Sequence, residues 1–314
     1  MPYPAALTET GWRKRLVLDT KPLNVRDAAI SFIRWASSMS FTMVQISDTH
    51  LGASTRLFRA NFDRMAAALG LLRPDLIVHT GDLSNDGADR EADLACAAAS
   101  HARLHGPVLC VPGNHDVGDH PERALHQPVD DARLNRFCSR VGPDRWVQDR
   151  EGWRLLGLNS QVMGAHREAD EQAAMIAGAL DTLGRRRLAV FIHKPFFTAD
   201  PAETAFDYWS VPPFARGPIG AVMAHPALRL VASGHLHLYR DAMRGRVRYA
   251  WAPSVAFVVD PADQADLPGE RCCGFLLHEF GEDAVATRLV VPDGMERPFI
   301  HEVPGAAYLE APEA

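Results

Sequence analysis

Five apolar stretches of this chain each end in a short run of Asp, Asn or His, and this repeated feature strongly constrains the fold. The stretches have the length and the Ile, Val and Leu content of buried β-strands. The polar runs that follow them are Asp48-Thr-His50, Gly81-Asp82, Gly113-Asn-His-Asp116, His193 and Gly234-His-Leu-His237. In open α/β sheets the carboxyl ends of the strands lie along one edge, where ligands bind. We therefore expect the five polar runs to meet at one rim.

The hydrophobic periodicity predicts strands that alternate with helices. The expected strands are 42–47, 75–80, 107–111, 153–158, 188–192 and 228–232, and the expected helices are 56–72, 88–104, 168–183 and 217–224. Residues 246–291 are rich in short strands, which suggests a second sheet stacked on the first. This pattern predicts an α/β fold, a four-layer αββα sandwich of two mixed β-sheets flanked by helices. Residues 117–149 and 198–216 are expected to be irregular.

The two ends of the chain differ from this regular central part. Residues 1–40 are predicted to be an N-terminal extension, with a short amphipathic helix at 26–37 and no other clear pattern. Residues 41–300 are expected to form one domain, and residues 301–314 a C-terminal tail. Packing of the N-terminal extension against the core is the competing interpretation.

Composition excludes several classes of protein. Apolar residues make up 47% and charged residues 23% of the chain, so it can bury a core. The net charge of -6 argues against nucleic acid as a partner. The sequence has neither an apolar stretch of membrane-spanning length nor a secretory signal, so we expect no membrane partner. The cysteines, which form no C-x-x-C pair, fit a reducing compartment and a cytoplasmic location; they are Cys96, Cys110, Cys138, Cys272 and Cys273.

The polar runs together contain the donors of a metal site. Carboxylate oxygens and imidazole nitrogens suit Mn, Fe, Zn or Co, and the lack of a thiolate disfavours a structural zinc site. The candidate ligands are Asp48, His50, Asp82, Asn114, His193, His235 and His237. This set is too large for one tetrahedral ion and suits two ions that share a carboxylate. Two such ions activate a water molecule and hold the attacking and leaving oxygens in phosphoryl chemistry.

Each part of this set also has a simpler interpretation. Asp48 and Asp82 could cap helices, and Asn114 could be a turn residue with left-handed geometry. The i,i+2 spacing of His235 and His237 would place both on the same face of a strand. The glycines that precede Asp82, Asn114 and His235 fit sharp turns at strand ends.

The ordered motifs Asp-x-His, Gly-Asp, Gly-Asn-His-Asp, His and Gly-His-x-His resemble those of the calcineurin-like metallophosphoesterases. The resemblance spans about residues 42–240, and its five parts in fixed order make it specific. The Gly-Asp-Leu-Ser-Asn-Asp-Gly run at 81–87 is most similar to class III cyclic nucleotide phosphodiesterases and glycerophosphodiesterase-like enzymes. The resemblance implies a phosphodiesterase with a dinuclear metal centre, in which a metal-bridging hydroxide attacks a small phosphodiester. Residues 41–300 would be the metallophosphoesterase domain.

The resemblance also implies a role for each matching residue. The first metal ion would be held by Asp48, His50 and His237, the second by Asn114, His193 and His235, and Asp82 would bridge them. His115 would not be a ligand but would contact a phosphate oxygen and protonate the leaving alkoxide. The competing role for His115 is to orient other groups in the site.

Several other residues are candidates for substrate contacts. Asn85 follows the bridging aspartate and is predicted to touch the substrate. The aromatic residues Phe196, Phe197 and Trp209 lie after His193 and are predicted to wall a pocket or stack on a nucleobase. Alternatively, they close the loop onto a small core of its own. Lys194 could meet a phosphate or point to solvent.

Two other functions remain as alternatives. A phosphomonoesterase would use the same metal centre, although the segment around Asn114 lacks the Arg of the protein phosphatases. A non-catalytic scaffold would have lost one or more ligands, whereas all seven positions are filled here. The expected partner is therefore a small phosphodiester, and homodimerisation remains open because similar families often form dimers.

Overall fold

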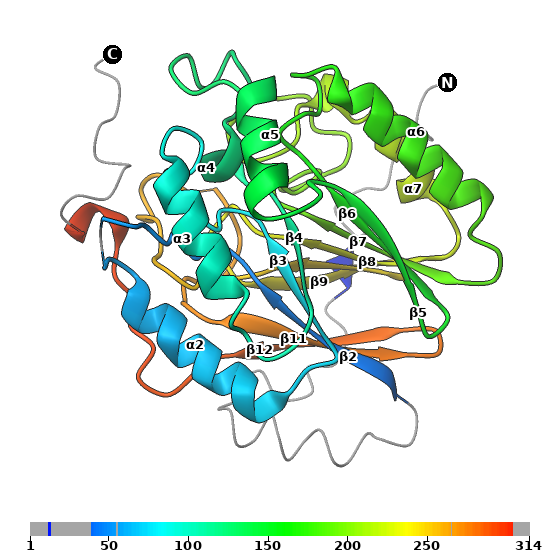
Figure 1. Cartoon of the computed structure of the whole chain (residues 1–314). Coiled ribbons are helices and arrows are strands. Elements are labelled where there is room, and N and C mark those ends of the chain that lie inside the picture. Colours follow the sequence, from blue (N-terminus) through cyan, green and yellow to red (C-terminus); the bar gives the residue numbers. More distant parts are fainter. Residues whose placement is uncertain (1–11, 14–38, 55, 265, 304–314) are drawn as a thin grey trace.

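Two β-sheets pack face to face in this computed structural model, which describes residues 12–13, 39–54, 56–264 and 266–303 (Figure 1). The predicted helix at 26–37 and most of the N-terminal extension lie outside these residues. The larger sheet has the strand order β1-β9-β10-β8-β7-β6-β5, and the smaller has the order β12-β11-β2-β3-β4. Both contain parallel and antiparallel pairs, so the predicted class of two mixed sheets is confirmed.

Each sheet contains a set of parallel strands, and the carboxyl ends of the two sets lie near one another. In the smaller sheet, β2 (Met39–Ile46), β3 (Leu76–Thr80) and β4 (Val108–Val111) run parallel. In the larger sheet, β6 (Trp153–Leu158), β7 (Arg187–Ile192), β8 (Leu228–Ser233) and β10 (Val247–Trp251) do the same. The flanking strands are β1 (Trp12–Arg13), β5 (Trp146–Arg150), β9 (Arg240–Arg244), β11 (Phe275–Gly281) and β12 (Val285–Val290).

Helices cover the outer faces of the two sheets, as Figure 1 shows. On the smaller sheet, Phe62 and Met65 of α2 (Arg59–Leu72) and Leu94 of α3 (Glu91–His101) join one apolar cluster with Val44 and Ile77. On the larger sheet, α6 (Glu168–Asp181) and α7 (Gly220–Ala224) pack on β6, β7 and β8. The remaining helices are α4 (Asn114–Val117), α5 (Asp131–Arg140) and the short 3-10 turns Pro213–Ala215, Gly217–Ile219 and Ile300–Glu302.

The period of two along each strand separates the helix-facing core from the core between the sheets. In β7, Val190 lies in the cluster with the helices, whereas Phe191 lies in a cluster that also holds Met43 and Val78 of the smaller sheet. Both faces of these strands are buried, which explains their nearly continuous apolar sequences. The result is the predicted four-layer αββα arrangement.

Two expectations about local structure were wrong. Residues 246–291 do not form a sheet of their own, because β10 joins the larger sheet while β11 and β12 join the smaller one. Residues 117–149, expected to be irregular, contain α5 and β5. The side chain of Asp130 accepts a hydrogen bond from the Arg133 N–H at 2.8 Å, which is a standard N-cap for α5.

Candidate metal centre

The predicted ligands come from both sheets rather than from one. Asp48, Asp82 and Asn114 follow β2, β3 and β4, while His193 and His235 follow β7 and β8. The strand ends are joined directly: the Asp48 N–H donates to the Gly81 carbonyl at 3.0 Å, and the Gly234 N–H donates to the His193 carbonyl at 3.0 Å. The site therefore forms where the carboxyl ends of the two stacked sheets meet.

The side chains converge in three groups, each able to hold a metal ion. Within each group the candidate ligand atoms lie within 4.8 Å of one another; the groups are Asp48–His50–His237, His50–Asp82–His115 and Asp82–His193–His235. All seven predicted ligands are at most 7% exposed. Buried carboxylates and imidazoles this close together need a compensating charge or hydrogen bonds.

Asp48 and Asp82 direct their carboxylates into the site through specific hydrogen bonds. The His235 N–H donates to Oδ2 of Asp48 at 3.1 Å, while Oδ1 is buried without a hydrogen-bond partner and lies 3.3 Å from Nε2 of His237. The His115 N–H donates to Oδ1 of Asp82 at 2.8 Å. Oδ2 of Asp82 lies 3.3 Å from Nε2 of His193 and 3.9 Å from Nε2 of His50. Oδ1 of Asp48 is buried without a hydrogen-bond partner, and Oδ2 of Asp82 lies near two imidazole nitrogens. Both oxygens are suited to bind a cation.

Backbone carbonyls orient three of the histidines. A carbonyl can only accept, so the ring nitrogen facing it carries the proton. Nδ1 of His193 donates to Thr80 at 2.7 Å, and Nδ1 of His237 donates to Phe257 at 2.9 Å. His235 is reversed, because its Nε2 donates to the carbonyl of Tyr208 at 2.9 Å. The second nitrogen of each ring is thereby left for the site, as in most metal-binding histidines.

The charges in the site are strongly coupled. Burial alone would raise the pKa of Asp82, but the neighbouring His193, His115 and His50 hold it well below its usual value. Burial opposes the charged form of His193, yet Asp82 raises the pKa of His193 to about 9. For His50 and His235, burial lowers the pKa well below the usual value. The low pKa of Asp82 favours its ionised form, and a metal ion can replace the proton that His193 otherwise holds.

Five of the predicted ligands have a left-handed backbone. The φ angles are +54° for Asp48, +44° for His50, +54° for Asp82, +68° for His235 and +51° for His237. Residues other than glycine enter this region at a cost of about 1–2 kcal/mol each. Such strained positions concentrate at functional sites because the surrounding structure must hold them there. The alternative that Asp48 and Asp82 cap helices is wrong, because α2 and α3 begin at Arg59 and Glu91.

The simpler interpretation of the spacing of His235 and His237, as two residues on one face of a strand, is wrong. They do not lie on a strand, because β8 ends at Ser233 and the chain turns sharply after it. Both residues have positive φ; His235 joins the group with Asp82 and His193, whereas His237 joins the group with Asp48 and His50. Asn114, in turn, is the first residue of α4 rather than a left-handed turn residue.

The glycines at the strand ends serve two different purposes. Gly81 has a φ of +96°, as expected for a sharp turn, whereas Gly113 has a φ of -104°. At Gly113 and Gly234 the reason is space: a Cβ would lie 2.0 Å from Oδ1 of Asp82 and 1.9 Å from Oγ of Ser47, respectively. The absence of a side chain at these positions lets the backbone approach the ligand-bearing loops.

We expect Gly113→Ala to destabilise the protein by about 1–3 kcal/mol or more, since the new methyl group would also lie 2.4 Å from the backbone N of Asp82. Urea denaturation of the apo-protein measures this effect. Gly178→Ala in α6 is the matched control, because no heavy atom lies within 4 Å of the added Cβ. That control should gain about 0.5–1 kcal/mol from helix propensity. Equal urea midpoints for Gly113→Ala and the unaltered protein would contradict the packing argument.

Asp116 joins two of the ligand loops. Its carboxylate accepts hydrogen bonds from the backbone N–H groups of Gly113, Leu83 and Ser84, and from the Ser84 hydroxyl at 2.6 Å. Burial, followed by the charge of Asp82, raises the pKa of Asp116 to about 6. This residue therefore ties the loop after β3 to the loop after β4.

The residues predicted to contact substrate lie in different places. Asn85 is 5% exposed, its Oδ1 is buried without a hydrogen-bond partner, and its carbonyl accepts from Nδ1 of His115 at 2.8 Å. Trp209 lies beside the ligands, with its ring centroid 6.0 Å from that of His235. Lys194 is buried and binds both carboxylate oxygens of Asp119, at 2.7 and 2.9 Å, instead of pointing to solvent.

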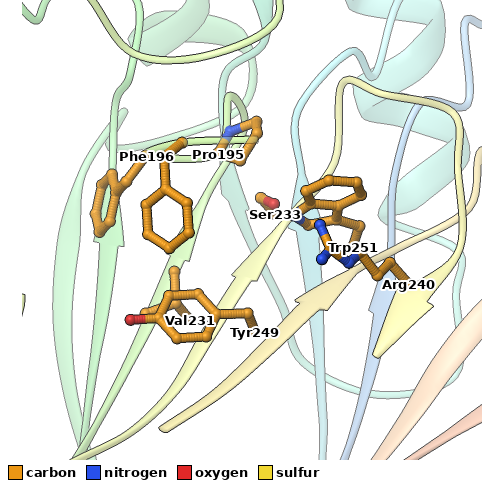
Figure 2. A pocket seen from close by; sticks show the side chains of 8 residues that line it. Pro195, Phe196, Val231, Ser233, Arg240, Tyr249 and Trp251 are labelled. Carbon is orange, nitrogen blue, oxygen red and sulfur yellow. The ribbon is translucent and has the colours of Figure 1, made fainter. Parts of the chain in front are cut away.

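Phe196 and Phe197 line a separate small cavity between β8, β10 and the loop after β7 (Figure 2). Its volume of about 10 Å³ suits roughly one water molecule. The ring of Phe197 packs against that of Tyr249, with centroids 5.2 Å apart, and Figure 2 shows Arg240 and Trp251 farther along the sheet. The two phenylalanines are 2% and 5% exposed, so a base could stack on either ring only after the ring became accessible.

The contacts by which some residues support the site could not be recognised from sequence. The hydroxyl of Thr49 lies 3.1 Å from Nε2 of His79 and 3.2 Å from Nε2 of His101, directly behind the loop that carries Asp48 and His50. Tyr208 contacts two predicted ligands through its carbonyl and hydroxyl. No local motif marks these positions, because each contact joins segments at least 27 residues apart.

The sequence that forms this site matches a known family. The sequence model of the calcineurin-like phosphoesterases matches residues 41–239, which is more than half of the chain. The chain belongs to this family. The protein is accordingly a hydrolase of phosphoric esters, as the resemblance of its motifs implied.

Individual relatives of this phosphoesterase carry more specific names. It is 29% identical over 243 residues to the 3',5'-cyclic adenosine monophosphate phosphodiesterase CpdA of Pseudomonas aeruginosa, a match that covers 72% of this chain and 80% of that protein. It is also 29% identical over 167 residues to the glycerophosphodiester phosphodiesterase GpdQ of Enterobacter lignolyticus, covering 49% of this chain and 56% of that one. A dimetal phosphatase from Danio rerio shares the fold, with a TM-score of 0.51, 14% identity, and coverage of 81% of this chain and all of that one.

Among the described residues, no helix is both long enough and apolar enough to cross a membrane.

Proposed function

We propose that this phosphoesterase is a dinuclear metal-dependent phosphodiesterase that hydrolyses small diesters such as cyclic nucleotides or glycerophosphodiesters. The observation that carries the proposal is the position of Asp82. It belongs to two of the three metal-binding groups, and its Oδ2 lies between Nε2 of His50 and Nε2 of His193. A shared carboxylate of this kind supports two adjacent cations better than one.

The proposed ligand sets follow from the groups. Asp48, His50 and His237 would hold one ion, and Asn114, His193 and His235 would hold the other, with Asp82 common to both. Bound metal ions of this kind supply Lewis acidity and a water molecule of lowered pKa. The donor set accepts Mn, Fe, Zn or Co.

His115 is proposed to protonate the leaving group. The Asn85 carbonyl accepts from Nδ1 of His115 at 2.8 Å, which fixes the ring and leaves Nε2 to serve as the acid. His115 lies within the group that includes His50 and Asp82, with its ring centroid 4.9 Å from that of His50. Protonated at Nε2, it would donate to the departing alkoxide oxygen, the step that alkyl leaving groups need most.

The charge near the site supports a diester over a monoester. Lys194 directly follows a proposed ligand, but its ammonium is neutralised by Asp119. A phosphodiester carries one negative charge, whereas a monoester carries close to two at neutral pH and needs more positive charge around it. The relatives whose names specify phosphodiesterases are consistent with this preference. A cytoplasmic location and homodimerisation remain predictions.

Metal removal and a substrate panel test the proposal. After dialysis against a chelator, the protein should lose activity towards bis(p-nitrophenyl) phosphate, and added Mn²⁺ should restore it. Initial rates should then be compared for cyclic nucleotides, glycerophosphodiesters and p-nitrophenyl phosphate. We expect the best diester to exceed the monoester by about tenfold or more in kcat/KM.

Each contrary result of this test has a distinct meaning. Full activity without metal would contradict the metal-dependent mechanism. A preference for the monoester would favour the phosphomonoesterase alternative. A protein that purifies without metal, binds no added Mn²⁺ and hydrolyses none of these substrates would point to a non-catalytic scaffold.

A further inference from the structure

Tyr208 lies against the proposed second metal site in the segment that connects β7 to the turn at Pro213–Ala215. Its ring centroid is 4.8 Å from that of His235. Its carbonyl accepts a hydrogen bond from Nε2 of His235 at 2.9 Å, and its hydroxyl accepts one from Nδ2 of Asn114 at 3.1 Å. One residue thus contacts two of the proposed ligands through two different groups.

The two hydrogen bonds decide which ligand atoms face the site. Because Nε2 of His235 donates to Tyr208, Nδ1 bears the lone pair, and it lies 3.2 Å from Nε2 of His193. Because Nδ2 of Asn114 donates to the hydroxyl, Oδ1 is directed towards Nε2 of His193, also at 3.2 Å. An amide can rotate to exchange its oxygen and nitrogen, and only the oxygen can bind a cation.

The segment that carries Tyr208 is held in place by its own polar groups. The Glu203 carboxylate accepts from the N–H groups of Thr198 and Ala199 at 3.0 and 3.2 Å, and pairs with Arg216 at 3.3 Å. The Asp207 carboxylate accepts from the N–H groups that follow Tyr208, including that of Trp209 at 2.9 Å. A segment built this way can hold the Tyr208 carbonyl and hydroxyl at defined positions.

Lys194 supports the ring itself. Its Nζ lies 4.7 Å from the centroid of the Tyr208 ring, close enough for a cation–π contact, while Asp119 holds the ammonium in place. The ring is therefore bounded by Lys194 and by His235. These contacts restrict the orientation of the hydroxyl towards Asn114.

We infer that Tyr208 is a positioning residue for the second metal site, its hydroxyl fixing the amide of Asn114 and its carbonyl fixing the tautomer of His235. This inference rests on the proposed function, because it assumes that Asn114 and His235 hold a metal ion. Residues that orient ligands in this way commonly change metal affinity by about 10- to 100-fold when altered.

Tyr208→Phe tests the hydroxyl alone, since it keeps the ring and the carbonyl. Titration of the full-length apo-protein with Mn²⁺, followed by the electron paramagnetic resonance of free Mn²⁺, resolves the two binding steps. We expect one step to weaken by about 10- to 100-fold and the other to stay within about twofold. At saturating Mn²⁺ the kcat of Tyr208→Phe should approach that of the unaltered protein, because the variant is defective in metal affinity and not in turnover. Tyr249→Phe, which removes the hydroxyl of a residue that lines the separate cavity of Figure 2, is the matched control and should leave both steps unchanged.

A second background tests the mechanism of this effect. In Asn114→Asp the amide is replaced by a carboxylate with two equivalent oxygens, so orientation by Tyr208 is no longer needed. Adding Tyr208→Phe to that variant should change the affected step by no more than about threefold. A full loss in that background would show that the hydroxyl does not act by orienting the amide.

Three further outcomes would contradict either the role of Tyr208 or the proposed function on which that role rests. If both binding steps of Tyr208→Phe match those of the unaltered protein, Tyr208 has no positioning role. If both steps weaken equally and the melting temperature of the apo-protein falls, the residue is a general structural support, and the inference is also wrong. If the unaltered protein binds no Mn²⁺ at all, the proposed function itself fails.

Discussion

Asp82→Asn should reduce turnover by about 1,000-fold or more and weaken the binding of both metal ions. The reason is that Asp82 belongs to two ligand groups and its Oδ2 faces both His50 and His193. An amide has the same shape but lacks the negative charge, and its nitrogen cannot bind a cation. Metal analysis of the purified variant, together with kcat on bis(p-nitrophenyl) phosphate at saturating Mn²⁺, measures both effects.

Asp63→Asn provides the control for the same chemical change at the surface. Asp63 lies on α2, pairs with Arg59 at 2.9 Å and is 58% exposed in its side chain, so its loss should change neither metal content nor rate. If Asp82→Asn instead retains two equivalents of metal and a near-normal kcat, Asp82 does not bridge the ions. Loss of only one ion would make Asp82 a ligand of a single site.

His115→Ala should keep both metal ions but lower kcat by about 100- to 10,000-fold for substrates with alkyl leaving groups. The ring is held by the Asn85 carbonyl and lies beside His50 and Asp82, where it can protonate the departing oxygen. A substrate that releases p-nitrophenolate needs little protonation and should lose much less rate. Comparing the two kinds of substrate therefore separates proton donation from a general disturbance of the site.

The control for this variant is His301→Ala, a change at a half-exposed histidine that pairs with Asp260 at 3.3 Å. It should have no effect on either class of substrate. Loss of one metal ion from His115→Ala would instead identify His115 as a ligand, a role that its group with His50 and Asp82 also permits. Equal loss of rate with both leaving groups would argue for an orienting role.

Much of the fold and of the candidate site could be predicted from local sequence pattern. Strands such as 188–192 were recognisable because residues that face the helices alternate with residues that face the other sheet, and both are apolar. The polar runs at their ends were recognisable because a strand that delivers a ligand changes abruptly from Ile, Val and Leu to Asp, Asn or His. The seven predicted ligands do converge on one place.

Other features of the site depend on contacts between distant segments. The simpler interpretation of the i,i+2 spacing placed His235 and His237 on one face of a strand, but both lie beyond the end of β8 with a left-handed backbone, and they fall in two different groups. Lys194 was a candidate for phosphate binding, but Asp119, 75 residues away, neutralises it. Phe196 and Trp209 were both predicted to wall a substrate pocket. Phe196 instead lines the separate cavity of Figure 2, whereas Trp209 lies beside His235.

The sequence by itself determined the class of the fold, the identity of the candidate ligands and the family to which the chain belongs, because each depends on the order and period of neighbouring residues. Only the tertiary structure decided that the site lies between two sheets, that Asp82 faces two groups, and that Tyr208 orients Asn114 and His235. These features depend on hydrogen bonds and packing between segments far apart in the chain, which no local pattern records.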